Sequence, residues 1–163
     1  MNIRIHHFFD IIRDFGSGKK IVPHQSLHAY HKVAEQIREN PNIELKIVVQ
    51  SDKVCMGCVY LEKSICDDTI SHRKDFTLKE EFNNYLDKRI IDVCGFEYSE
   101  KYSPKLLYKL AYKYIENIEF IYEGNDAPHT FLRKKNVIRG LKYYSEKHGF
   151  EINLKFGIYI FSL

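Results

Sequence analysis

The sequence predicts an α/β or α+β fold, with a small sheet of about three to four strands covered by about five helices. Three observations favour this class. A length of 163 residues fits a single domain over residues 1–163, and a hydrophobic content of 44% is typical of globular chains. Apolar residues recur three and four positions apart, as on the buried face of a helix. Short β-branched, apolar runs typical of strands lie between these segments.

Each predicted helix combines an apolar face with residues that start or end helices. The expected helices cover residues 3–15, 26–39, 77–93, 103–117 and 132–147. Ser103 followed by Pro104 is a typical helix start, because Ser caps free N–H groups and Pro fits the first turn. Gly95 after Cys94 is a typical helix end, because Gly adopts the left-handed conformation there. Strands are expected at residues 43–49 and 118–122, with one or two more within 151–161.

Three of the four cysteines, Cys55, Cys58 and Cys66, lie in one polar stretch that follows the strand predicted at residues 43–49. Two thiols at C-x-x-C spacing can hold one metal ion or cluster, because a turn lets both side chains point inward. Cys94, at the expected end of a helix, can reach back to this stretch. We therefore predict a metal centre held by Cys55, Cys58, Cys66 and Cys94.

The spacing of the cysteines bears on the kind of centre. Zinc sites usually draw their ligands from two close pairs, whereas this chain has one pair and two single cysteines. That pattern is closer to iron–sulfur ligation, so we predict an iron–sulfur cluster with a role in electron transfer or redox chemistry. The alternative is a structural zinc site, in a small enzyme or in an adaptor that binds nucleic acid or protein. A second alternative is a thiol redox protein that uses Cys55 and Cys58.

The first predicted helix adds polar groups to these candidates. His6 and His7 point about 100° apart around the helix, and Asp10 shares a stripe with His6. Imidazole is a common metal ligand and titrates near neutral pH. The simpler interpretation is a half-buried histidine bonded to backbone or to Asp10. His6, His7 and Asp10 are therefore candidates either to support the ligands or to replace one of them.

A second group of histidines could share one face of a helix. His24, His28, His31 and Glu35 stand at suitable offsets, and such a set could bind zinc, nickel or iron. However, Pro23 indicates that the helix begins after His24. We therefore interpret the group as a solvated polar face.

Composition and termini limit the partners. The net charge of +3 does not by itself imply nucleic acid, although one helix face could contact phosphates. That basic face consists of Arg133, Lys134, Lys135, Arg139 and Lys142. The apolar runs are too short to cross a membrane, and the first residues lack the plan of a signal peptide. We expect a cytoplasmic protein, where clustered cysteines bind metals more often than they form disulfides.

The Arg4-x-His6-His7 start, followed by Cys55-x-x-Cys58 and Cys66, resembles an uncharacterised family of short bacterial and archaeal proteins. This domain of unknown function is suspected of binding an iron–sulfur cluster. Its members open with Arg-Pro-His-His-Leu-Leu-Cys and later carry Asp-x-Ile-Cys-x-x-Cys and one more Cys.

The resemblance covers about residues 3–115. It implies a metal-binding part over residues 1–115 and a C-terminal helix–strand extension over 116–163. Asp10 stands where the family has its first Cys. The resemblance therefore leaves open whether Cys94 or Asp10 is the fourth ligand, and it implies no particular reaction.

Overall fold

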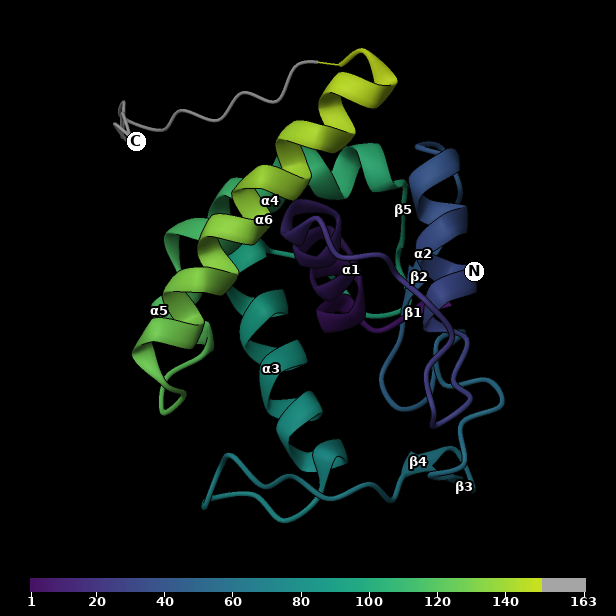
Figure 1. The fold of residues 1–163 in the computed structure, drawn as a ribbon, viewed down its shortest axis with the longest axis vertical. Helices are drawn as coiled ribbons and strands as arrows, with labels where there is room; N and C mark the ends of the chain where they lie inside the picture. The colour runs from purple at the N-terminus through teal and green to yellow at the C-terminus, as the bar shows by residue number, and fades with distance from the viewer. Residues whose placement is uncertain (151–163) are drawn as a thin grey trace.

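Helix α1 (Ile5–Ser17) lies in the middle of the computed structural model, which describes residues 1–150 (Figure 1). The other helices in this range are α2 (Tyr30–Glu39), α3 (Lys79–Cys94), α4 (Pro104–Glu116), α5 (Ile118–Ile121) and α6 (Ala127–His148). Helices α4 and α6 lie on one side of α1, and α2 lies on the other (Figure 1). Among residues 1–150, no helix has both the length and the apolar content needed to cross a membrane.

Two small sheets complete the described part of the fold. The first has the order β1-β2-β5, formed by β1 (Asn2–Ile3), β2 (Leu45–Ile47) and β5 (Lys101–Tyr102). Strand β1 is parallel to β2, and β5 is antiparallel to it. The second sheet is a hairpin of β3 (Leu61–Glu62) and β4 (Ile65–Cys66). This combination of helices with small sheets confirms the predicted α+β class, and the parallel pairing of β1 places the start of α1 beside the segment that follows β2.

Helices α1 and α6 pack closely because two glycines face each other where they cross. A Cβ atom on Gly140 would lie 1.8 Å from the carbonyl oxygen of Ile12, and one on Gly16 would lie 1.9 Å from the carbonyl oxygen of Asn136. Real Cβ atoms do not approach backbone this closely. The absence of a side chain at both positions therefore allows the two backbones to touch.

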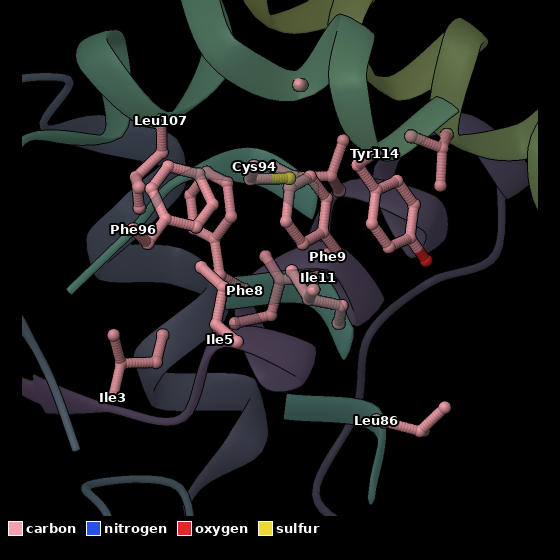
Figure 2. Packing of buried hydrophobic residues seen from close by; sticks show 14 of the residues in the cluster. Ile3, Ile5, Phe8, Phe9, Ile11, Leu86, Cys94, Phe96, Leu107 and Tyr114 are labelled. Carbon is pink, nitrogen blue, oxygen red and sulfur yellow. The ribbon is translucent and has the colours of Figure 1, made fainter. Parts of the chain in front are cut away.

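The core between α1, α4 and α6 is aromatic. The rings of Phe9 and Tyr114 stack with centroids 3.8 Å apart, and those of Tyr108 and Tyr144 stack at 4.0 Å. Cys94, at the end of α3, belongs to the same buried cluster (Figure 2). Aromatic side chains bury large apolar areas, so this cluster is the main hydrophobic contribution to stability on that side of α1.

The prediction of a strand at residues 118–122 was wrong, because this segment contains the short helix α5. Ile118 and Ile121 stand three positions apart and are both fully buried, which suits one helical turn better than the alternation of a strand. A further difference is that α2 begins only at Tyr30, so residues 24–29 form a loop. The strands predicted within 151–161 lie outside the described residues.

Two expected helix boundaries near the C-terminal half are also informative. Helix α6 begins earlier than expected, because Asp126 caps it by accepting from the N–H of His129 and Pro128 fits its first turn. The predicted start of α4 is confirmed, since the Ser103 side chain accepts from the N–H of Leu106. Local capping chemistry therefore sets both helix starts.

The close crossing of α1 and α6 makes Gly140 sensitive to substitution. Gly140→Ala should lower the free energy of unfolding by about 2 kcal/mol, because the added methyl group forces the helices apart. This loss should appear even though Ala is intrinsically the better helix former by about 1 kcal/mol. Urea denaturation would measure it, with exposed Lys135→Ala on the same helix as the control. A Gly140→Ala variant as stable as the control would contradict the packing described here.

Candidate functional site

One cavity of about 320 Å³ lies beside the N-terminal half of α1. Its walls come from α1, the 24–28 loop, the cysteine stretch, the first half of α3 and the start of α6. Three of the four cysteines line it, and so do six of the eight histidines. These histidines are His6, His7, His24, His28, His72 and His129. The fold therefore brings most of the chain's cysteine and histidine side chains to the walls of one cavity.

His7 is oriented by a buried carboxylate. Its Nδ1 lies 2.9 Å from Oδ2 of Asp52. Because a carboxylate only accepts hydrogen bonds, Nδ1 carries a proton, and Nε2 has a free lone pair when the ring is neutral. Burial opposes protonation of the ring, but the charge and hydrogen bond of Asp52, together with the charges of Asp10 and Asp87, outweigh it and raise the pKa of His7. No hydrogen bond to Nε2 occurs among residues 1–150, so this atom is available to a ligand.

Asp52 also holds the cysteine stretch. Its Oδ1 accepts from the N–H of Val54 at 2.9 Å, and from the N–H and thiol of Cys55 at 3.3 and 3.4 Å. Its Oδ2 accepts from the N–H of Arg4 at 2.6 Å. Burial would raise the pKa of Asp52, but His7 and these N–H donors hold it well below its usual range. One carboxylate therefore joins the start of α1 to the C-x-x-C loop.

His6 is oriented in the same way by Asp87, which is fully buried on α3. Oδ1 of Asp87 lies 2.8 Å from His6 Nδ1 and 2.9 Å from the His6 amide nitrogen. Arg4 completes the cluster, because its guanidinium donates to Asp87 at 2.7 Å, to Glu80 at 3.0 and 3.1 Å, and to Asn84 at 2.7 Å. Every charge in this buried group thus has an opposite charge in contact, which such burial requires.

The imidazoles of His6 and His7 differ in the direction of their pKa shifts. Burial lowers the pKa of His6 more than Asp87 raises it, so this ring favours the neutral form. For Asp87, burial opposes ionisation, but His6 and the Arg4 guanidinium hold the pKa of the carboxyl below its usual range. His6 and His7 are adjacent, with ring centroids 4.2 Å apart. A neutral ring therefore lies beside one that gains a proton more easily.

The predicted ligands do not all meet. Cys55, Cys58 and Cys66 line the cavity, whereas Cys94 is 1% exposed and packs in the aromatic core. Asp10 lines the cavity, but it pairs with Arg13 on its own helix and with Arg133 on α6. Burial opposes ionisation of Asp10, yet these two arginines hold its pKa well below the usual range.

The three thiols line the cavity but are not arranged to hold a metal ion. Within residues 1–150, no three His, Cys, Asp or Glu side chains are positioned to hold a metal ion as they stand. Burial, followed by the charge of Asp52, raises the pKa of Cys55 to about 12, and burial also raises the pKa of Cys66. Ligation therefore requires the cysteine side chains to turn and to lose their protons.

Several cavity residues were not predicted from the sequence. His72 and His129 are far from the cysteines along the chain, and nothing in their spacing marks them. His24 and His28 were interpreted as solvated, but they stack at 4.4 Å in a loop that borders the cysteine stretch. Asp52 does not line the cavity, but its role had a detectable sequence signal, because an acidic residue three positions before a C-x-x-C can cap its turn.

The basic face expected on the last helix is divided by its contacts. Arg133 is buried and bonded to Asp10, and Lys134 forms an ion pair with Glu119. Lys142 lies 3.8 Å from Glu146. Lys135 and Arg139 are exposed. These five residues therefore do not form one continuous basic surface.

The buried Asp87 cluster makes stability dependent on pH. A carboxyl whose pKa is lower in the folded chain contributes stability at neutral pH that is lost on acidification below about pH 5. The lowered pKa of His6 acts in the same direction, because the unfolded chain binds its proton first. Asp87→Asn should lower the free energy of unfolding at pH 7 by about 3 to 5 kcal/mol. Between pH 7 and pH 4, the variant should then lose less of its free energy of unfolding than the unchanged protein does. Urea denaturation at both pH values would measure this.

Asp92→Asn is the matched control, because Asp92 lies on the same helix and its side chain is 55% exposed beside Lys88. It should change the free energy of unfolding by about 0.5 kcal/mol or less. Equal stability of the two variants at pH 7 would show that the Asp87 cluster does not hold the fold.

Comparison with known proteins places the chain in a family. The model of a family described as "Protein of unknown function (DUF1284)" matches residues 24–123, more than half of the chain. The matched range includes Cys55, Cys58 and Cys66 but begins after His6 and His7. No curated protein and no solved structure matches the chain. The chain therefore belongs to the DUF1284 family of proteins of unknown function, in agreement with its resemblance to an uncharacterised family.

Proposed function

We propose that this protein binds a metal centre through Cys55, Cys58 and Cys66, with Nε2 of His7 as the fourth ligand. The observation that supports the proposal is that the three thiols and the oriented imidazole line the same cavity. Thiolate and imidazole together are typical ligands of soft metals. His7 is chosen because Asp52 contacts both its ring and the C-x-x-C loop.

The donor chemistry fits two kinds of centre. The irregular spacing of the cysteines favours an iron–sulfur cluster, and three Cys with one His is also a common zinc set. A cluster would supply one-electron redox chemistry, whereas zinc would supply structural support. We therefore place the iron–sulfur cluster first and zinc second.

The surrounding residues support His7, one of the alternatives expected from the sequence, over Cys94 or Asp10 as the fourth ligand. Cys94 lies in the aromatic core, so it does not serve in the proposed centre. Asp10 is held by Arg13 and Arg133, which compete with a metal for its carboxylate. His7 has neither restriction. Its bond to Asp52 is the usual carboxylate support of a metal-bound histidine.

The thiol redox alternative has less support. Reactive C-x-x-C cysteines have a lowered pKa, because the thiolate is the nucleophile. Burial and Asp52 have the opposite effect on Cys55, whose pKa is raised to about 12. Cys55 would therefore be a slow nucleophile at neutral pH.

Metal analysis of two cysteine variants tests the proposal. Anaerobically purified protein should contain either iron with acid-labile sulfide or about one zinc per chain. Cys58→Ser should lose most of that metal, because one thiolate is removed from the cavity. Cys94→Ala should keep it, since Cys94 belongs to the core, although it should be somewhat less stable.

Elemental analysis and a visible spectrum would measure the metal in each variant. Full retention in Cys58→Ser, or loss only in Cys94→Ala, would contradict the proposed ligand set. Brown protein with iron and sulfide would identify the cluster, and colourless protein with zinc would identify the alternative.

A further inference from the structure

The α6 end of the cavity contains a buried arginine that is only partly used. Arg133 lines the cavity, and its side chain is 8% exposed. One terminal nitrogen donates to Asp10, and the guanidinium carbon lies 4.4 Å from the ring centroid of Tyr122. Its Nε is buried and has no hydrogen-bond partner among the described residues. This Nε has almost no accessible surface, so the donor left for a ligand in the cavity is the second terminal nitrogen, for which no hydrogen bond occurs among the described residues.

Other hydrogen-bond donors line the same end. The side-chain oxygen of Asn125 accepts from Arg73 at 2.6 Å, which leaves its NH₂ group to donate. His129, exposed at the start of α6, lines the cavity as well. Guanidinium, amide and imidazole N–H groups together are the usual partners of a carboxylate or phosphate.

The charges around the cavity permit an anion. The lining includes three cationic side chains (Arg4, Lys79 and Arg133) and three carboxylates (Asp10, Asp68 and Glu80). Each carboxylate already contacts a cation, through the pairs Asp10–Arg133, Asp68–Lys79 and Glu80–Arg4. An entering anion therefore meets no unpaired negative charge from these three carboxylates.

We propose that this end of the cavity binds a small anionic ligand through a carboxylate or phosphate group, held by Arg133 with Asn125 and His129. The anion site is independent of the metal, because none of these three residues is a proposed metal ligand. Asp10 competes with the anion for the Arg133 guanidinium.

Calorimetric titration with inorganic phosphate and with succinate tests this site, using purified protein whose metal content has been determined. Succinamide serves as the uncharged probe. We expect phosphate or succinate to bind and succinamide not to bind. Arg133→Met should weaken anion binding about tenfold or more, because it removes the buried guanidinium. Lys135→Met, which removes a charge two residues away on the same helix, should leave binding unchanged.

Asp10→Asn keeps the test decisive if Arg133→Met does not fold. It should strengthen anion binding severalfold, because it frees one guanidinium nitrogen and removes a negative charge. Four results would overturn the anion site. The first two are that neither anion binds, or that succinamide binds as tightly as the anions. The other two are that Lys135→Met weakens anion binding as much as Arg133→Met, or that Asp10→Asn does not strengthen it. Anion binding that survives Arg133→Met but disappears in Cys58→Ser would place the anion on the metal and would also overturn it.

Discussion

The arrangement around the cavity depends on the carboxylate of Asp52. This one side chain accepts from the backbone N–H of Arg4, the ring of His7, and the backbone and thiol of Cys55. The start of α1 and the C-x-x-C loop are far apart in sequence, and the Asp52 side chain contacts both of them. Because a buried carboxylate needs several donors, losing any of these contacts would weaken the others. The placement of the start of α1 beside the C-x-x-C loop therefore depends on satisfying one buried charge.

Local signals predicted most of the helical fold. The apolar face of α1, the Ser103-Pro104 start of α4 and the Gly95 end of α3 each depend on neighbouring residues only, and the structure confirms them. Residues 118–122 are a segment whose structure local signals did not predict. Their β-branched composition favours a strand, but contacts from distant helices bury Ile118 and Ile121 on one helical turn. Tertiary packing decided that segment, and packing cannot be inferred from five residues.

The candidate site was predictable only in part, for the same reason. Clustered cysteines and the His6-His7 pair are visible in the sequence, and the structure places Cys55, Cys58, Cys66 and both histidines on one cavity. The position of Cys94 was not visible, because a helix end can face either the core or a loop. Arg133 shows this limit most clearly. It lies beyond the residues matched by the family model, yet the close crossing of α1 and α6 brings it to Asp10.

The metal affinity of an Asp52→Asn variant tests most directly whether this carboxylate supports a metal centre. Asp67→Asn, an exposed position in the same stretch that does not line the cavity, is the matched control. Competition with a chelator would measure the affinity of each refolded, metal-loaded protein. If Asp52 orients His7 and the C-x-x-C loop as ligands, Asp52→Asn should bind the metal about 10- to 100-fold more weakly than the control. Equal affinities in the two variants would contradict the central role of Asp52.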